Sequence, residues 1–343
     1  MFTAMFGSVE QGIIYAILAL GVYLTFRVLD FPDLTVDGSF VTGAATAATM
    51  IVLGYHPIIA TLAAIVAGFI AGCITGLLHT KGNINPLLAG IIMMIALYSI
   101  NLRIMGFSRE NVVSLPNVTL LNNETIFIQF TNFWEKLNID PILTNLLMSL
   151  GVERPPKTWS VLFIGLLLII VLKIVVDWFL KTEVGLAIRA TGDNRRMIRS
   201  FSANTDTLII LGVGLSNGLV ALAGALIAQY NRSADGTMGI GMIVVGLASI
   251  IIGEAIFGTK SIVRITFAVI IGAIIYRIVL ALALQVPFLD ASDFKLITAS
   301  IVVLALIIPR IIEKQKDKKR KAKRLKERLE AAKLSKQGGD HLA

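Results

Sequence analysis

Two carboxylates, Asp33 and Asp37, lie four residues apart in the stretch FPDLTVDGSFVTGAATAA, Phe31 to Ala48, which has a long apolar run on either side. A carboxylate beside a broken helix can accept from the backbone N–H groups of the next helix, or it can bind a cationic group. Pro32 and Gly38 favour such a break, because proline donates no backbone hydrogen bond and glycine weakens a helix. The stretch therefore predicts an irregular polar turn between two apolar segments.

Three interpretations of this turn remain open. Asp33 could cap the second segment by accepting from backbone N–H groups near Thr35, Asp37 could contact the ammonium group of a solute, or the stretch could be a simple cytosolic turn. Irregular backbone and carboxylates persist at membrane depth only where they face protein or water. We therefore expect the turn and one later polar residue to face neighbouring protein or to line a water-filled pathway. The predicted pathway residues are Asp33, Thr35, Asp37, Ser39 and Asn217.

A second group of functional residues lies in the loop KTEVGLAIRATGDNRRMIRSFSANTDT, Lys181 to Thr207. Small residues and a short helical pattern predict a helix along the cytoplasmic surface with a low-profile face, and its charged residues could pair with a docked protein. Periodicity alone fits an ordinary basic inner loop as well. The predicted docking residues are Glu183, Gly185, Arg189, Gly192 and Asp193.

Enzymatic motifs are not apparent in the sequence. The stretch GEAIFGTKS, Gly253 to Ser261, resembles a phosphate-binding loop but has the wrong spacing and ends an apolar run. GVGLSNG, Gly212 to Gly218, likewise lacks the spacing and the βαβ setting of a dinucleotide site. The three histidines are scattered and the single cysteine lies in an apolar run. We expect no catalytic residue, no metal and no cofactor.

Composition predicts an all-α polytopic membrane protein. Hydrophobic residues make up 56% of the 343 residues and charged residues only 15%, against about 25% charged residues in soluble domains. Apolar runs near the spanning length predict about nine transmembrane helices. The predicted spans are 9–29, 34–53, 57–78, 87–106, 159–180, 207–229, 240–258, 262–284 and 294–312.

Charge distribution predicts the orientation of these spans. The loop at 181–206 is basic, and from Arg310 onward there are thirteen Lys/Arg against five Asp/Glu, so both regions are expected to be cytoplasmic. The N-terminus and the long loop at 107–158 then face outside, and the C-terminus faces inside. We divide the chain into a permease domain at 1–312 and a basic tail at 313–343. The tail carries most of the net charge of +9, so the basic pI is no sign of nucleic acid binding. The tail could lie against anionic lipid, or it could be a solvated or disordered segment.

Three blocks of sequence resemble one transporter class. They are AILALGVYLTFRVLDFPDLTVDGSFVTGAATAA, AGCITGLLHTKGNINPLLAGIIMMIAL, and TEVGLAIRATGDN followed by GVGLSNGLVALAGALIA. Together they resemble the membrane-spanning permeases of binding-protein-dependent ABC importers, the class that includes the branched-chain amino acid and ribose permeases. The likeness covers roughly residues 9–310. The chain departs from the class in the additional acid Asp37, and many members have one more N-terminal span.

The resemblance implies a set of partners and a direction of transport. It implies separate ABC ATPase subunits at the inner face, an extracytoplasmic solute-binding protein, a second permease copy forming a homodimer, and a cell-membrane location. The loop at 181–206 would be the coupling helix. The first block is similar to permeases paired with binding proteins for tryptophan or tyrosine, which implies an amino acid as the solute. An ion-coupled secondary transporter or channel is the alternative, since broken helices with acidic residues also build ion sites.

Overall fold

The computed structural model describes residues 2–149, 155, 156, 158–201, 203–285, 296–300, 303 and 307. The predicted span 294–312 lies mostly outside these residues, and the predicted tail at 313–343 lies wholly outside them. Helices dominate the described part. They are α1 (Phe2–Tyr23), the π-helical segment η1 (Leu24–Val28), α2 (Thr35–Val52), α3 (Pro57–Thr80), α4 (Pro86–Gly106), α5 (Ile126–Lys136), α6 (Asp140–Ser149), α7 (Ser160–Phe179), α8 (Glu183–Asp193), α9 (Arg195–Ser200), α10 (Thr205–Asn231), α11 (Met242–Phe257) and α12 (Ile262–Ala283).

Six of these helical stretches are long and apolar enough to cross a membrane. They are Met5–Val28, α3, α4, α7, α10 and α12. The predicted span 34–53 forms the 18-residue α2, which is rich in alanine, glycine and threonine and is not among the six. The predicted span 240–258 forms α11, an apolar helix of only 16 residues. The described residues thus form a mostly α-helical, polytopic membrane protein with six candidate spans.

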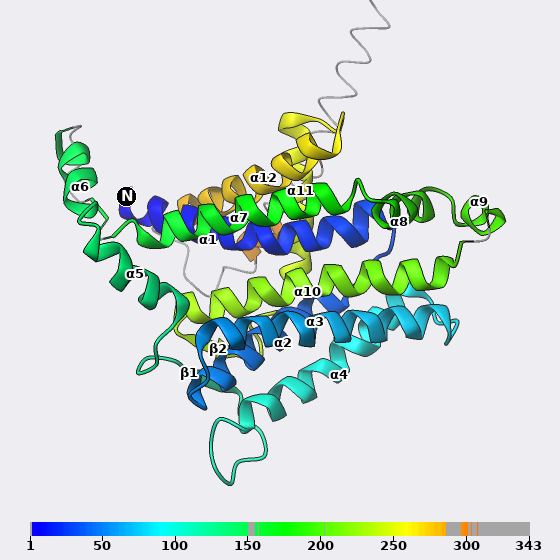
Figure 1. Ribbon diagram of the computed structural model, residues 1–343, viewed down its shortest axis with the longest axis horizontal. Coiled ribbons are helices and arrows are strands. Elements are labelled where there is room, and N and C mark those ends of the chain that lie inside the picture. Colours follow the sequence, from blue (N-terminus) through cyan, green and yellow to red (C-terminus); the bar gives the residue numbers. More distant parts are fainter. Residues whose placement is uncertain are drawn as a thin grey trace, which may run out of the picture.

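The spans pack in two groups that meet at α1 and α10 (Figure 1). Helices α7, α11 and α12 accompany α1, whereas α2, α3 and α4 accompany α10. The regularly spaced glycines of α3 allow a close approach within the second group. A Cβ on Gly72 would lie 2.5 Å from the carbonyl oxygen of Val213, so only glycine fits against the α10 backbone there. Tight helix packing at this position is what small residues permit in membranes.

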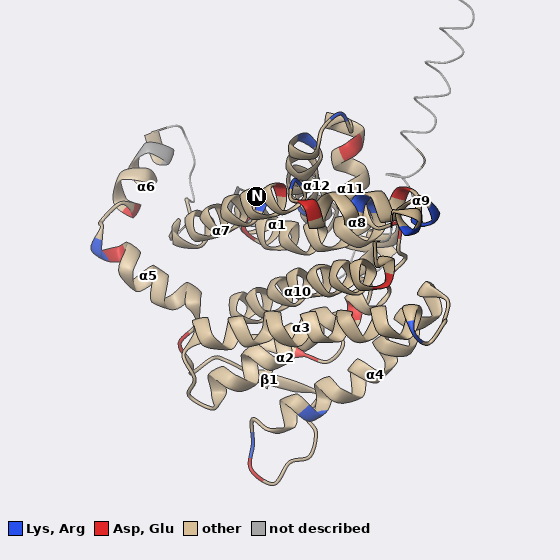
Figure 2. Ribbon diagram, turned by 45° about the vertical axis from the view of Figure 1, so that its right-hand side comes forward, with Lys and Arg blue, Asp and Glu red and all other residues tan. Residues whose placement is uncertain are grey.

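Short elements occupy the two ends of the bundle. Strands β1 (Asn117–Thr119) and β2 (Ser233–Asp235) pair antiparallel, with Asn117 opposite Asp235. Together with α5 they lie at one end of the long helices, whereas α8 and α9 lie at the other (Figure 1). Figure 2 shows that the bodies of α3 and α10 carry few charges and that many of the charges lie around α8 and α9. The predicted placement of 107–158 and 181–206 on opposite membrane faces stays a prediction, and the described parts of the two segments lie at opposite ends of the long helices (Figure 1).

One ion pair is buried within the first helix group. In α7, Lys173 Nζ lies 2.5 Å from Asp177 Oδ2, and the two side chains are 19% and 9% exposed. The hydroxyl of Thr266 in α12 donates to the other oxygen of Asp177 at 2.6 Å. The carboxylate therefore joins α7 to α12 inside an apolar segment. Sequence analysis missed this pair, although its spacing of four residues within an apolar run was a readable signal.

Replacing Asp177 with Ala should destabilise the protein by ~3 kcal/mol, because it leaves a largely buried ammonium group, 19% exposed, without its partner. The double variant Lys173→Leu/Asp177→Leu should recover most of that loss, since it removes both charges. Thermal unfolding in detergent measures both effects. If Asp177→Ala were as stable as the double variant, the ion pair would not contribute to the stability of the protein.

Candidate functional site

The predicted turn after the first span is buried among helices. The chain leaves the π-helical segment, adopts a left-handed conformation at Asp30 with φ of 51°, and reaches α2 at Thr35. Asp33 is fully buried, and the backbone N–H of Thr35 donates to its Oδ1 at 2.8 Å. The interpretation of Asp33 as an acceptor for the start of α2 is therefore confirmed.

The second oxygen of Asp33 connects the turn to α10. The side-chain amide of Asn217 donates to Asp33 Oδ2 at 2.6 Å and to the carbonyl of Val213 at 2.9 Å. The hydroxyl of Thr35 lies 2.8 Å from that of Thr75 in α3. Three of the predicted pathway residues thus form one buried polar cluster that holds α2, α3 and α10 together. Such satisfied polar contacts are the way carboxylates persist inside a helical bundle.

Ser39 lies apart from this bonded cluster. Its side chain is fully buried, and its hydroxyl has no hydrogen-bond partner among the described residues. The Oδ1 atom of Asn217 is also without a partner there. In this structure the predicted pathway residues described so far face neighbouring helices. That they line a transport pathway stays a prediction.

Asp37 contacts a different element. Its Oδ2 accepts from the backbone N–H of Gly241 at 2.9 Å, and its Oδ1 accepts from that of Ile243 at 2.8 Å. These N–H groups begin α11, so the carboxylate of one helix caps the positive end of another. Sequence analysis missed this role, because Asp37 and Gly241 lie 204 positions apart in the sequence.

Replacing Asp37 with Ala should lower the free energy of unfolding by ~2 kcal/mol, because two buried N–H groups lose a charged acceptor. Asp37→Asn should retain part of this stability, since its amide oxygen still accepts one hydrogen bond. Thermal unfolding and uptake kinetics of the two variants distinguish the two interpretations of Asp37, which are capping of α11 and contact with the solute. Unchanged unfolding together with a raised KM would favour solute contact over capping.

The predicted docking loop forms two helices instead of the single helix expected. Thr182 caps α8, with its hydroxyl accepting from the N–H of Gly185 at 3.2 Å. The chain becomes extended at Asn194, with φ of −156°, and the amide oxygen of that residue accepts from Met197 to begin α9. The asparagine breaks the helix because its side chain offers the backbone a competing hydrogen bond.

Two glycines hold α8 against the spans. A Cβ on Gly185 would lie 2.1 Å from the carbonyl oxygen of Phe179, at the end of α7. A Cβ on Gly192 would lie 2.2 Å from the carbonyl oxygen of Val28, at the end of η1. These predicted docking residues therefore face inward and fix α8 to two spans, rather than presenting the low-profile outer face expected from the sequence.

The outer face of α8 is partly apolar. Glu183 and Asp193 are exposed. Val184 and Leu186 are 45% and 50% exposed on the same helix. These two apolar side chains therefore lie on the outward surface of α8, beside its charged residues.

Two charged residues of α8 line a polar cavity at the α8 end of the first helix group. Arg189 and Asp193 line this cavity of about 430 Å³ together with Arg27 and Glu254. Arg27, at the end of η1, forms an ion pair with Glu254, near the end of α11. The sequence offered no signal for this pair, because 227 residues separate its members. The cavity therefore connects the predicted docking helix with α11. Within the described ranges, no group of three or more His, Cys, Asp or Glu side chains is arranged to hold a metal ion.

Comparison with known proteins identifies the family. The family described as "Branched-chain amino acid transport system / permease component" matches residues 4–309. The chain is 40% identical to the tyrosine transport system permease protein of Clostridioides difficile (strain R20291), over 86% of this chain and 88% of that relative. It is 34% identical to the uncharacterized protein RP368 of Rickettsia prowazekii (strain Madrid E), over 87% and 95% of the two chains.

A more distant similarity extends to sugar transport. The chain is 23% identical to the ribose import permease protein RbsC of Escherichia coli (strain K12), over 73% of this chain and 68% of that relative. No solved structure is significantly similar to the chain. Because the family match covers nearly all of the described residues, the chain belongs to the family of branched-chain amino acid transport system permease components.

Proposed function

We propose that this permease imports an amino acid, with ATP hydrolysis confined to separate subunits that act on α8. As a permease of an ABC-type transport system, the chain belongs to assemblies that also contain an ATPase and a solute-binding protein. The observation that carries the proposal is the position of α8. Its inner face is fixed to α7 and η1 through Gly185 and Gly192, and its outer face exposes Val184 and Leu186. A force on the outer face therefore reaches two spans directly.

The polar cavity supports a route from α8 to α11. Arg189 and Asp193 share it with the ion pair of Arg27 and Glu254. A shift of α8 changes the surroundings of that pair, and the pair joins η1 to α11. Asp37 holds the other end of α11 to α2. A rigid-body switch between two packings of these helices would open the pathway alternately to the two membrane faces.

The same proposal includes the orientation of the chain in the membrane, its division into two parts and its assembly. We place the N-terminus and the loop at 107–158 outside, and the loop at 181–206 and the basic tail at 313–343 inside, with the permease domain at 1–312. Two copies of the chain would form the pathway in the cell membrane as a homodimer. The cluster of Asp33, Thr35 and Asn217 would lie along this pathway once the helices move apart.

Reconstitution tests the function and its energy source. The permease, the ATPase and the solute-binding protein are placed in liposomes, and uptake of labelled tyrosine, leucine and ribose is compared with and without internal ATP. We expect ATP-dependent amino acid uptake that requires the binding protein, and no comparable uptake of ribose. Accumulation by the permease alone, driven by a proton or sodium gradient, would instead favour the ion-coupled transporter.

A further inference from the structure

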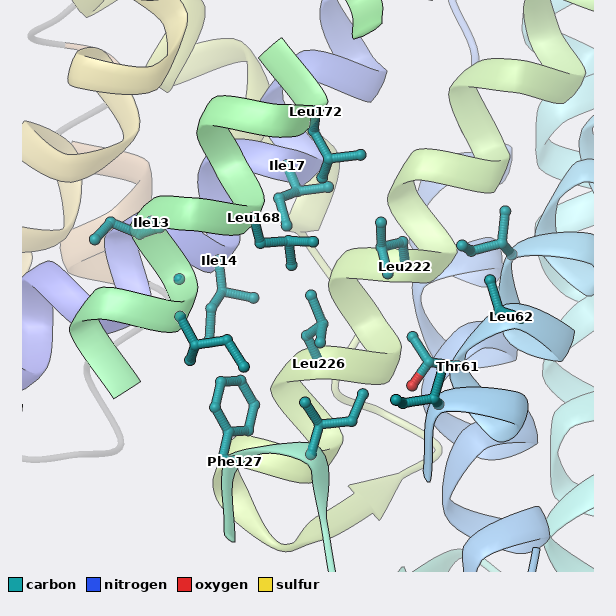
Figure 3. A pocket seen from close by; sticks show the side chains of 15 residues that line it. Ile13, Ile14, Ile17, Thr61, Leu62, Phe127, Leu168, Leu172, Leu222 and Leu226 are labelled. Atoms are coloured by element: carbon teal, nitrogen blue, oxygen red, sulfur yellow. The ribbon is translucent and has the colours of Figure 1, made fainter. Parts of the chain in front are cut away.

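An apolar groove separates the two helix groups, and Figure 3 shows its lining. It has a volume of about 280 Å³. Ile14 of α1 and Leu168 of α7 form one wall, whereas Leu62 of α3 and Leu222 and Leu226 of α10 form the other. For comparison, a ~150 Å³ cavity lined by Leu, Ile and Phe holds a benzene molecule. The groove has room for a longer aliphatic segment.

The groove offers no free polar group to a transported solute. Thr61 supplies the one hydroxyl in its lining. That hydroxyl donates to the carbonyl of Pro57 at 2.8 Å and accepts from the amide of Gln229 at 2.8 Å. A zwitterionic amino acid in the groove would lose its water without gaining hydrogen bonds, which is unfavourable. The occupant should therefore be aliphatic.

The rim of the groove faces outward along α3. Ile58 and Leu62 line the groove and are 52% and 58% exposed. Because α3 is long and apolar enough to span a membrane, we expect this rim to face the acyl chains of the bilayer. The side chains that line an empty groove would lack dispersion contacts on one side, and an acyl chain in the groove would supply those contacts.

A polar pocket continues the groove at one end. Phe127 lines both spaces, and the second pocket, of about 360 Å³, also contains Asn132 and Arg232. Arg232 is exposed and forms no ion pair with any residue in the described part of the chain. The hydroxyl of Tyr230, which also lines this pocket, donates to Glu10 at 3.0 Å, so that carboxylate is already engaged.

Aromatic residues mark the same end of the bundle. The rings of Trp134 and Phe163 stack at 4.7 Å, and those of Phe6 and Trp159 meet edge to face at 5.0 Å. Tryptophan is enriched where a membrane protein meets the headgroup layer. We therefore expect the polar pocket to lie near the headgroup layer and the groove to extend towards the hydrocarbon.

We propose that the groove and the polar pocket together bind one phospholipid molecule. An acyl chain lies in the groove between α7 and α3, and the guanidinium of Arg232 donates to the phosphate, for which its planar fork is suited. The lipid fills the space between the two helix groups, so its binding depends on how far apart they are.

Native mass spectrometry of the full-length protein, loaded with phosphatidylglycerol in mild detergent, tests the proposal. We expect one retained phospholipid per chain. Leu168→Trp fills the groove and should lower retention about tenfold, equivalent to ~1.4 kcal/mol. Leu167→Trp is the matched control, because Leu167 is 61% exposed and lies outside the lining. Arg232→Gln should lower retention severalfold, and Arg232→Lys should restore part of it.

A second measurement avoids any folding defect. In a Cys73→Ser background, Leu62→Cys is modified after purification with a long-chain alkyl thiosulfonate, which places an alkyl chain in the groove. The attached chain should expel the phospholipid, whereas the same modification of Ile70→Cys, 53% exposed on α3 and outside the lining, should not. Absence of lipid from the unmodified protein, or equal retention in every variant, would overturn the proposal. Replacement of the lipid by a second chain or by bound amino acid would also overturn it.

Discussion

Changing Leu186 to Asp is expected to reduce ATP-driven uptake at least about 30-fold, because it places a charge in the centre of the proposed ATPase contact. Leu186 is 50% exposed on α8 and is not among the residues of the described hydrophobic core. Truncation of a central apolar contact in an interface commonly weakens association by ~2 kcal/mol or more, which corresponds to that factor. Uptake and permease-stimulated ATP hydrolysis in liposomes containing all three components measure the effect.

The control is the same chemical change at the opposite end of the molecule. Leu137 follows α5 and is 49% exposed, so Leu137→Asp adds an equal charge at an equally accessible site away from α8. We expect it to leave ATPase stimulation intact. If both variants behave like the unmodified protein, α8 is not the coupling element.

Changing Gly192 to Ala should reduce uptake by more than about tenfold, because it forces α8 away from η1. The added methyl group would lie 2.2 Å from the carbonyl oxygen of Val28, a backbone atom that cannot rotate aside. Overpacking of this kind costs ~1–3 kcal/mol, so part of the effect should appear as reduced stability. Uptake and thermal unfolding are measured on the same preparation.

Gly218 in α10 provides the comparison for this substitution. A Cβ there would find its nearest atoms at 3.5 Å, an ordinary contact, so Gly218→Ala should leave uptake and unfolding almost unchanged. Equal behaviour of the two alanine variants would contradict the proposed linkage between α8 and η1. A Gly192→Ala protein with normal unfolding but no uptake would give that linkage its strongest support.

Local chemistry made several features predictable. The break before α2 follows from Pro32 and the polar residues around it, and Asp33 binds the N–H of Thr35 only two residues away. The glycines that recur along α3 are visible in the sequence, and they permit the close contact of Gly72 with the carbonyl of Val213. Such features depend on neighbours in the chain or on a helical repeat, and both can be read from the residues themselves.

Contacts between distant segments could not be predicted in this way. Asp37 caps α11, which begins more than 200 residues later, and Arg27 pairs with Glu254. The glycines of α8 face inward, because the position of η1 decides which side of that helix is buried. None of these arrangements follows from periodicity, since each depends on how separate helices meet.

The sequence by itself determined that this protein is an apolar, helical membrane protein, because the length and composition of a span are local properties that the bilayer imposes on every helix. Only the tertiary structure decided what the polar residues do there. Inside the bundle each carboxylate must find donors on whichever helix packs against it, and that choice depends on the packing of the whole molecule.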